Sequence, residues 1–324
     1  MKLSRRVVLK MSGLAPLLGL ASRAFAAEPI RLATVASGTV AWEVDTIIKN
    51  GFDSKYGLAL SVVPVAGKQS ADVMLAGGEA DVIVTDWIWV SRQRNAGADY
   101  TFLPYSRAVG SILVKGDSAI KSLSDLKGKK IRVAGGPTDK SWVLFQALAK
   151  KDLGFNLASD ATPVFAAPPL LNEQLISGQI DALITFWQFA AKLRGAGARD
   201  IASVADAAKA LGLDAETPLL GYVYSEKWSK AHGDAAQKLA LASADAKALL
   251  ATSDAEWDRL RPMMKVADDA EFANLKAGFR GGIPHTNAVN GEAAAKLFAV
   301  LAAVGGATLV GDRPELAPGT FSAP

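Results

Sequence analysis

Short apolar runs alternate with longer amphipathic stretches from Pro29 onward. The short runs are rich in β-branched residues, as expected for buried strands, whereas apolar positions in the longer stretches recur with the period of a helix. The first part of this pattern predicts strands at 30–35, 58–65 and 82–85, and helices at 40–54, 70–76 and 87–95. Such alternation is typical of an α/β protein with mainly parallel sheets.

The segment 75–98 occurs a second time, 100 residues later, at 175–198. The positions that coincide include Leu75/Leu175, Gly78/Gly178, Asp81/Asp181, Thr85/Thr185, Trp87/Trp187, Arg94/Arg194 and Gly97/Gly197. The repeat predicts a second set of strands at 130–134, 162–166 and 182–185, with helices at 140–152, 170–176 and 187–194. Because two copies are too few for a solenoid, we expect two similar lobes with a ligand between them.

Two longer apolar runs, at 101–115 and 217–224, follow the two copies and are predicted to cross between the lobes. From Glu226 onward the pattern is helical, which predicts a helical C-terminal region that covers the lobes. After about residue 305 the content of Gly and Pro rises, so we expect a loosely packed end. The expected organisation is lobe I at 27–110 plus 222–324 and lobe II at 111–221.

Residues 1–26 have the composition of an export signal peptide. Lys2, Arg5, Arg6 and Lys10 form a basic start, 7–20 are apolar, and 24–26 form an A-x-A cleavage site. The segment 4–10, Ser-Arg-Arg-Val-Val-Leu-Lys, matches the twin-arginine pattern, which predicts Tat export, and a Sec signal is the alternative. We therefore expect a soluble mature protein in the periplasm.

Charge and cysteine content narrow the class of protein further. The whole chain has a formal charge of +4, but the signal peptide holds five basic residues and no acidic one, so the mature chain has a charge of −1. This balance disfavours nucleic acid as a partner. The chain has no cysteine, which excludes thiolate metal sites and cysteine nucleophiles. We expect no later apolar run of the about 18 residues that a membrane span needs, and so no membrane-embedded segment.

In open α/β sheets, ligands bind beyond the carboxyl ends of the strands, where loops lead into helices. Several segments of this chain meet that condition, some in each copy of the repeat. The candidate ligand-binding residues in them are Ser37, Gly38, Thr39, Trp42, Glu43, Lys68, Gln69, Ser70, Asp86, Trp87, Gly136, Pro137, Thr138, Asp139, Lys140, Phe186, Trp187 and Gln188.

The loops at 37–39 and 135–138 are small, carry hydroxyl groups and directly precede helices. Free backbone N–H groups and the positive end of the helix dipole suit a carboxylate, sulfonate or phosphate at such a place. The alternative is that Thr39 and Thr138 cap their helices.

Tryptophans are frequent in the same segments. Trp87 and Trp187 stand where a buried strand ends, so we expect them to line the site and to stack on a planar or cationic ligand. Trp89 and Trp142 lie on helix faces and are expected in the core instead.

The charges in these segments are mixed, since Glu43, Asp86 and Asp139 accompany Lys68 and Lys140. A zwitterion, an amine or a heterocycle fits this mixture better than inorganic nitrate does. A salt bridge between the lobes, made by Asp139 and Lys140, is the alternative role for that pair.

No metal or cofactor is expected. The two histidines, His232 and His285, lie in the tail and are not at ligand spacing, and the chain has no Asp-rich calcium loop. A hard cation held by Glu43, Asp86 and Asp139 is the weaker alternative.

The segment 120–133, Ile-Lys-Ser-Leu-Ser-Asp-Leu-Lys-Gly-Lys-Lys-Ile-Arg-Val, contains the motif I-x-S-L-x-D-L-K-G-K. Together with the loop 36–39 and the segment 75–82, it resembles the periplasmic substrate-binding proteins of ABC importers for nitrate, sulfonate, taurine and thiamine-precursor ligands. The resemblance extends from Glu28 to about Asp312. It implies a type II periplasmic binding protein, whose two lobes are mainly parallel sheets flanked by helices and close on one small ligand.

These observations together predict the solute-binding component of an ABC import system, a monomer that delivers its ligand to a permease with an ATPase. The expected ligand is a small organic sulfonate, amine or heterocycle. A lyase-like enzyme on the same fold is one alternative, but no nucleophile–base pair is visible, so we expect no enzyme. A periplasmic accessory or sensor protein is the other alternative. Ligand choice is expected where the copies differ, at Asp86 against Phe186 and at Ile88 against Gln188.

Overall fold

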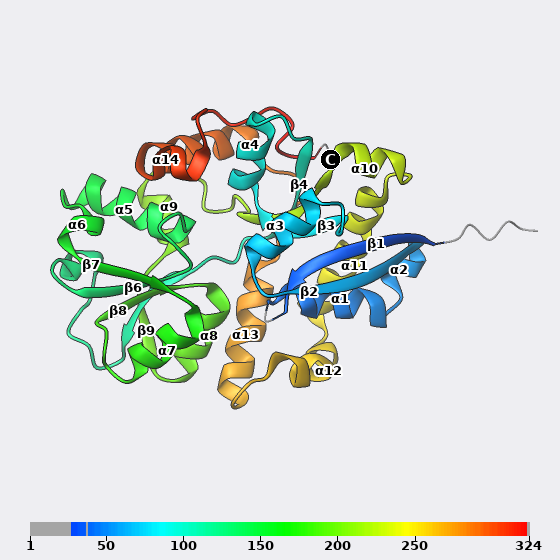
Figure 1. Cartoon of the computed structure of the whole chain (residues 1–324). Coiled ribbons are helices and arrows are strands. Elements are labelled where there is room, and N and C mark those ends of the chain that lie inside the picture. Colours follow the sequence, from blue (N-terminus) through cyan, green and yellow to red (C-terminus); the bar gives the residue numbers. More distant parts are fainter. Residues whose placement is uncertain (1–26, 37, 323–324) are drawn as a thin grey trace, which may run out of the picture.

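The computed structural model describes residues 27–36 and 38–322. The predicted signal peptide and the candidate residue Ser37 lie outside this range. Two five-stranded sheets, each flanked by helices, form two lobes that stand side by side (Figure 1). The predicted α/β class and the two lobes are therefore confirmed.

The sheet of lobe I has the strand order β2-β1-β3-β10-β4. β1, β2 and β3 run parallel, whereas β10 runs antiparallel to both of its neighbours. The strands are β1 (Glu28–Val35), β2 (Leu58–Val65), β3 (Val82–Asp86), β4 (Tyr100–Ser106) and β10 (Leu220–Ser225).

The sheet of lobe II has the corresponding order β7-β6-β8-β5-β9. β6, β7 and β8 run parallel, and β5 runs antiparallel to both of its neighbours. The strands are β5 (Ser111–Lys115), β6 (Lys130–Ala134), β7 (Thr162–Ala166), β8 (Ala182–Thr185) and β9 (Ala198–Ser203). Each sheet thus contains a parallel set of three strands followed by an antiparallel strand.

Helices cover both sheets, and the tail adds five more. The helices of the first copy are α1 (Val40–Lys49), α2 (Phe52–Lys55), α3 (Lys68–Ala76) and α4 (Trp87–Asn95). Those of the second are α5 (Lys140–Asp152), α6 (Leu157–Asp160), α7 (Pro168–Ile176), α8 (Trp187–Gly195) and α9 (Val204–Ala210), preceded by a 3-10 turn at Leu123–Leu126. The tail forms α10 (Glu226–Ala231), α11 (Ala235–Thr252), α12 (Asp254–Met264), α13 (Asp269–Gly282) and α14 (Gly291–Val310).

One predicted helix is divided. The expected helix at 40–54 ends at Lys49, and α2 begins at Phe52. Gly51 between them has a φ of 68°, a left-handed conformation that a helix cannot contain and that glycine adopts at little cost.

The 100-residue repeat is a structural repeat. α3 and α7, β3 and β8, and α4 and α8 each begin 100 residues apart. Gly78 and Gly178 have φ values of 71° and 74°, and Gly97 and Gly197 have 99° and 85°. Because other residues rarely adopt these values, the shared glycines let the chain leave a helix at the same places in both lobes.

The chain crosses between the lobes near the middle of the molecule. The apolar run at 101–115 divides into β4 of lobe I and β5 of lobe II, joined by 107–110. The run at 217–224 leads from lobe II into β10 of lobe I. The prediction that these two runs connect the lobes is confirmed. A third connection, 283–290, joins α13 to α14.

The end of the chain packs more closely than its composition predicts. The backbone N–H of Phe102 donates to the carbonyl of Thr320, and the N–H of Ser322 donates to the carbonyl of Phe102, both at 2.9 Å. The Phe321 ring packs against the rings of Phe102 and Trp87. The expectation of a loose end after residue 305 is wrong up to Ser322, because this segment hydrogen-bonds to the edge strand β4.

The apolar run that forms α14 is longer than the sequence analysis allowed. In the part of the chain that the structure describes, one helix is long and apolar enough to cross a membrane by length and composition, and it is Gly291–Val310. The expectation that no run after the signal reaches this length is therefore wrong. In the folded chain the helix packs against α4 of lobe I and α5 of lobe II, and Leu297, Phe298 and Leu301 are buried.

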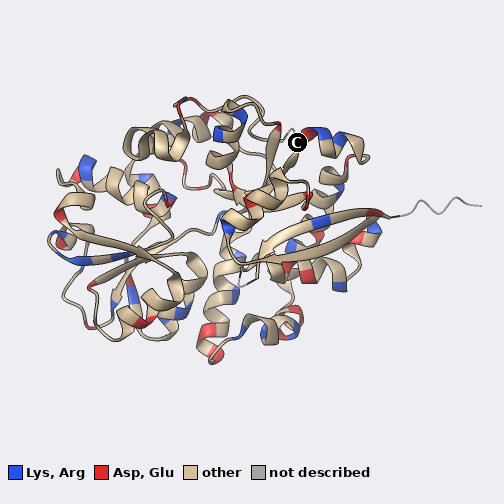
Figure 2. Ribbon diagram, in the orientation of Figure 1, with Lys and Arg blue, Asp and Glu red and all other residues tan. Residues whose placement is uncertain are grey.

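Charged residues of both signs are mixed over the molecule. Figure 2 shows Lys and Arg interspersed with Asp and Glu along the helices of both lobes. Pairs at helical spacing, such as Lys296 with Glu292 at 2.8 Å, account for some of this mixing. Such a distribution is typical of a solvated surface and does not favour a polyanionic partner.

Candidate ligand-binding site between the lobes

A buried ion pair joins the lobes at the carboxyl ends of their parallel strands. Asp86 ends β3 in lobe I, and Lys140 begins α5 in lobe II. The Nζ of Lys140 donates to Oδ2 of Asp86 at 2.7 Å, and the side chains of Asp86 and Lys140 are only 6% and 21% exposed. Two residues predicted for the site therefore contact each other across the interface.

Asp86 also caps the helix that follows it. Its Oδ1 accepts a hydrogen bond from the N–H of Trp89 at 2.8 Å and so caps α4. Burial acts to raise the pKa of Asp86, but the positive charges of Lys140 and Lys68 outweigh burial and hold the pKa below its ordinary value. Asp86 is therefore an anion at neutral pH.

Lys68 and Asp72 of α3 extend the ion pair into a cluster of four charges. The Nζ of Lys68 donates to Oδ2 of Asp72 at 2.9 Å and lies 5.3 Å from the centre of the Trp89 ring. Burial raises the pKa of Asp72. With Asp86 and Lys140, the cluster holds two lysines and two aspartates, so it presents no net charge to a ligand when all four are ionised.

A second contact between the lobes is aromatic. Trp42 of α1 and Trp187 of α8 meet edge to face, with ring centroids 6.2 Å apart and planes at 88°. The Phe279 ring lies 6.3 Å from Trp42, and a Cβ on Gly278 would stand 2.8 Å from the Trp187 ring. Trp42 and Trp187 therefore meet between the lobes beside α13.

α13 itself was not predicted as part of the interface. It lies between the lobes and packs along α8 (Figure 1). The Nζ of Lys192 on α8 lies 2.5 Å from Oε1 of Glu271 on α13, a second ion pair at this junction. The sequence shows α13 only as an amphipathic helix of the tail, so its position between the lobes has no local signal.

Trp87 does not take the place in lobe I that Trp187 takes in lobe II. It is fully buried, its Nε1–H donates to the carbonyl of Pro218 at 2.9 Å, and its ring packs against Phe298 and Phe321. This packing conflicts with the expectation that Trp87 stacks on a ligand. The cause is that α14 and the end of the chain cover α4.

The two other tryptophans of the repeat segments behave as predicted. Trp89 is 8% exposed, and its ring stacks on Tyr100 at 5.5 Å. Trp142 is 2% exposed and meets Phe165 edge to face. Both belong to the hydrophobic core, so the expectation for these two residues is confirmed.

The helices that begin at the interface differ in their capping. Asp139 precedes α5, and its carboxylate accepts from the N–H of Trp142 at 3.0 Å. Thr39 precedes α1 but makes no capping hydrogen bond, and no side chain among the described residues caps this helix. The alternative that Thr39 and Thr138 cap their helices is therefore wrong. Among the described residues, no side chain takes the first N–H groups of α1, whereas α5 begins with an acidic group.

Glu43 lies inside lobe I and not at the interface. Its Oε1 accepts from the hydroxyls of Tyr222 at 2.8 Å and Ser243 at 2.6 Å, and from the Nζ of Lys247 at 2.8 Å. Burial lowers the pKa of Lys247, and Glu43 acts in the opposite direction. These bonds tie α1 to β10 and α11. The sequence does not reveal them because Ser243 and Lys247 lie about 200 residues further along the chain.

The remaining candidates lie on loops or in the first turns of α3 and α8, at the same ends of the sheets. Phe186 is half-buried, with its ring 3.5 Å from where a Cβ on Gly135 would stand. Exposed candidates are Lys68, Gln69, Ser70 and Pro137, and partly exposed ones are Gly38, Gly136, Thr138 and Gln188.

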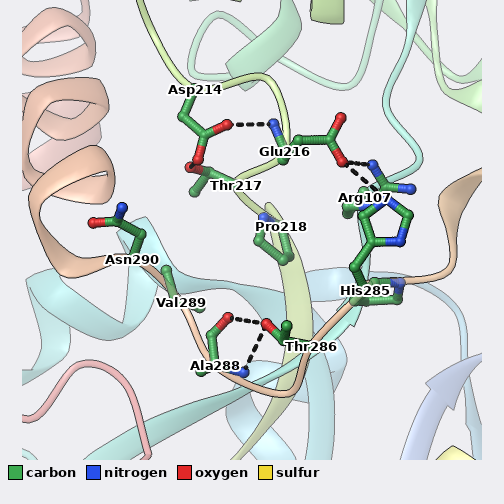
Figure 3. Close-up of a pocket in the computed structure, with 11 residues that line it drawn as sticks. Arg107, Asp214, Glu216, Thr217, Pro218, His285, Thr286, Ala288, Val289 and Asn290 are labelled. Carbon is green, nitrogen blue, oxygen red and sulfur yellow. Dashed lines mark hydrogen bonds and ion pairs between the residues drawn. The ribbon is translucent and has the colours of Figure 1, made fainter.

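A cavity of about 410 Å³ lies at the hinge, lined by residues from all three connections between the lobes (Figure 3). The Arg107 guanidinium pairs with Glu216, whose Oε2 lies 3.3 Å from Nε2 of His285. Arg107 also donates to the carbonyls of Ile283 and Gly281 at 3.1 Å. Because Arg107 is engaged by the connecting loop, its role is to hold α13 at the hinge. None of these residues was predicted for the site.

The geometry gives no support to a metal ion. The described residues contain no group of three or more His, Asp or Glu side chains placed to hold one. Of the three acids considered for a cation, Glu43 is bonded inside lobe I, Asp86 to Lys140 and Asp139 to the start of α5.

Two sheet lobes joined at a hinge, with charged and aromatic side chains meeting between them, define the class of two-lobed binding proteins. The family model described as NMT1/THI5 like matches residues 48–255, and the chain belongs to this family. No curated protein matches the chain significantly.

Solved structures with the same fold include several binding proteins. The aliphatic sulphonate binding protein SsuA from Escherichia coli has a TM-score of 0.73 and 20% identity, and 92% of each chain is covered. SsuA from Xanthomonas axonopodis pv. citri, bound to MOPS, has a TM-score of 0.69 and 19% identity over 91% of this chain and 98% of that chain. The nitrate-binding protein NrtA from Synechocystis PCC 6803 has a TM-score of 0.55 and 14% identity, over 76% of this chain and 69% of that chain. The resemblance predicted from the sequence is confirmed for family and fold, and these relatives are binding proteins, not enzymes.

Proposed function

We propose that this chain is the periplasmic solute-binding component of an ABC import system, which captures a small organic ligand between its lobes and delivers it to a permease. One observation carries the proposal. Side chains from the carboxyl ends of both sheets meet at a single interface, where Asp86 pairs with Lys140 and Trp42 contacts Trp187. Membership of the NMT1/THI5-like family and the sulfonate- and nitrate-binding relatives support the same function.

The charges at the interface favour an organic ligand over a bare inorganic anion. Both lysines of the interface are already paired, Lys68 with Asp72 and Lys140 with Asp86. The start of α1 offers N–H groups without a side-chain cap, which suit the acceptor end of a ligand. The aromatic edges of Trp42 and Trp187 suit an apolar part beside it. A small organosulfonate or a zwitterion has both features.

The proposed route to the periplasm is the predicted signal peptide at 1–26, with Tat as the pathway. The proposed working form is a monomer, because each chain supplies both lobes of the site.

Native mass spectrometry of the protein isolated from the periplasm tests the function directly. The expected result is one mature chain that starts after residue 26 and carries one small molecule. Thermal shift and calorimetry with taurine, ethanesulfonate and nitrate then rank the ligand classes, because a bound ligand stabilises the folded protein by RT ln(1 + [L]/Kd) and so raises the Tm.

Trp187→Ala is the informative variant and Trp228→Ala the matched control, since Trp228 stacks on His232 in α10, away from the interface. We expect the ligand shift to disappear in the first and to persist in the second. Equal ligand-induced shifts of the Tm in both variants would show that Trp187 does not contribute to the binding site. Consumption of the ligand by pure protein would instead favour the enzyme, and binding without any uptake defect in a deletion strain would favour a sensor.

A further inference from the structure

Two buried tyrosines lie side by side in lobe I but differ in their hydrogen bonding. Tyr105 of β4 and Tyr222 of β10 meet edge to face with centroids 5.4 Å apart. The Tyr222 hydroxyl donates to Glu43 at 2.8 Å. The Tyr105 side chain is only 3% exposed, yet its hydroxyl has no hydrogen-bond partner among the described residues. Because buried hydroxyls are nearly always bonded, this one is a candidate to bind a partner that the described residues do not supply.

Tyr105 stands one residue before the end of β4, so it belongs to the sheet edge at which the predicted ligand loops gather. Burial raises the pKa of Tyr105 well above its ordinary value, with a further contribution from the negative charge of Glu43, while the nearby Thr39 hydroxyl acts in the opposite direction. The phenol therefore keeps its proton at physiological pH and can donate it in a hydrogen bond. Thr39 precedes α1, the helix whose first N–H groups lack a side-chain cap.

A narrow crevice leads to Tyr105 from the side of α13. Its lining residues are Tyr105, Ser106, Lys247, Phe279, Gly282 and Ile283. In this conformation the crevice is too narrow for a ligand. One wall is the carboxyl end of α13, the helix that contacts Trp187 of lobe II at Gly278. α13 also packs against lobe I, because Phe279 shares a core cluster with Trp42 and Trp257. The wall of the crevice therefore lies at the junction of the two lobes.

The charges around the crevice indicate which end of a ligand fits. Lys247 pairs with Glu43 at 2.8 Å, so the two charges balance. The Nζ of Lys247 also lies 4.8 Å from the centre of the Tyr105 ring, which holds the ring in place. The buried Oε2 of Glu43 is an acceptor that also has no partner among the described residues. The groups that can donate to a ligand are a set of two kinds, the Tyr105 hydroxyl and the first N–H groups of α1. Such a set suits an oxygen acceptor of a sulfonate or carboxylate.

We propose that Tyr105 is a ligand-binding residue, which donates its phenol hydrogen bond to the acceptor end of the solute, next to the start of α1. This inference rests on the proposed function and adds to it a residue of the hinge strand that the sequence did not single out. Lys247 is then a positioning residue, because its Nζ lies over the Tyr105 ring.

The two neighbouring tyrosines provide a matched pair of variants. Tyr105→Phe removes a hydroxyl that has no hydrogen-bond partner among the described residues. We therefore expect an unchanged Tm and an affinity for ethanesulfonate or taurine that is lower by roughly tenfold or more, as for a lost hydrogen bond to a charged group. Tyr222→Phe removes the bond to Glu43, so we expect a lower Tm and a nearly unchanged affinity. Calorimetry at a temperature well below both Tm values measures the affinities.

Each outcome bears on the inference. Wild-type binding that is equally strong in Tyr105→Phe would overturn the role of Tyr105 and leave the proposed function intact. A lower Tm in Tyr105→Phe would show that the hydroxyl is bonded within the fold, which also overturns it. Wild-type protein that binds none of the probes and carries no ligand from the periplasm would overturn the proposed function and this inference with it.

Discussion

Lys140 of lobe II and Asp86 of lobe I form one ion pair across the interface, with Nζ and Oδ2 2.7 Å apart and little of either side chain exposed. A buried ion pair gains Coulomb energy but loses the hydration of both charges, so its net contribution to closing the lobes is small. Its geometric effect is larger, because any other approach of the lobes would leave Asp86 buried without its partner. The pair therefore selects one closed arrangement.

Lys140→Met should weaken ligand binding by roughly tenfold or more, because closure would then bury the Asp86 carboxylate without its counter-charge. Calorimetry with the ligand found by mass spectrometry measures the effect. Small-angle scattering should show a larger radius of gyration for the variant at a ligand concentration that closes the wild type.

Lys296→Met is the control for this variant. Lys296 pairs with Glu292 on the exposed face of α14, where an ion pair contributes little. If both variants bind like the wild type, the Asp86–Lys140 pair does not select the closed arrangement. If Lys140→Met binds more tightly, Lys140 competes with the ligand for Asp86.

Asp139 gives the protein a pH dependence of the opposite sign to that of Asp86. Burial raises the pKa of Asp139 above its ordinary value, so the folded protein favours the protonated acid. The stability from this group is complete below the ordinary pKa near 3.8 and is lost as the pH rises through the raised value. For Asp86, whose pKa is lowered, the stability is present above that pH and is lost as the pH falls through the lowered value.

Asp139→Asn should therefore raise the Tm at pH 7, because asparagine still caps α5 but carries no charge to bury. The difference from wild type should shrink as the pH falls, because the wild-type side chain then takes up its proton. Asp139→Ala removes the cap and should cost about 1 kcal/mol. Calorimetric scans of the three proteins between about pH 4 and 8 test the sign, and a lower Tm for Asp139→Asn at pH 7 would contradict it.

The repeat made the lobes predictable, because period and spacing are local properties. Trp87 and Trp187 show where that reasoning ends. They hold the same position in the two copies, and each follows a buried strand. Their surroundings differ in the folded chain. α14 and the end of the chain cover Trp87, whereas α13 brings Phe279 and Gly278 next to the pair of Trp42 and Trp187. Packing by a tail far along the chain leaves no mark on the sequence pattern around either tryptophan.

Glu43 and Tyr105 illustrate the same limit for polar groups. Glu43 follows a candidate loop and was assigned to the site, but Lys247 and Ser243 from the tail engage it inside lobe I. Tyr105 lies in an apolar run with nothing to distinguish it. Only its burial without a hydrogen-bond partner, a property of the folded chain, makes it a candidate. The sequence could predict which loops and helix starts lie at one edge of the sheets, but it could not predict the partner of each charged side chain.

The packing of Trp87 leads to a prediction that separates stability from binding. Trp87→Ala should lower the free energy of unfolding by about 3–5 kcal/mol, the usual cost of removing a buried Trp. Trp187→Ala affects a side chain that is 9% exposed and lies between the lobes, so its main effect should be on ligand binding. Denaturant unfolding and calorimetry of both variants provide the comparison. A Trp87→Ala protein that is as stable as wild type but fails to bind the ligand would show that Trp87 is a ligand-binding residue after all.

α13 offers a test of the contact between the lobes on one helix. A Cβ on Gly278 would lie 2.8 Å from the Trp187 ring, closer than side chains tolerate, whereas a Cβ on Gly281 would meet nothing within 4 Å. Gly281→Ala should therefore stabilise the protein by up to about 1 kcal/mol through helix propensity alone. Gly278→Ala gains the same propensity but must push Trp187 away from α13, and through Trp187 the edge contact with Trp42. We expect ligand affinity to fall in Gly278→Ala only. Equal affinities in the two variants would show that α13 does not set the position of Trp187 in the ligand-bound protein.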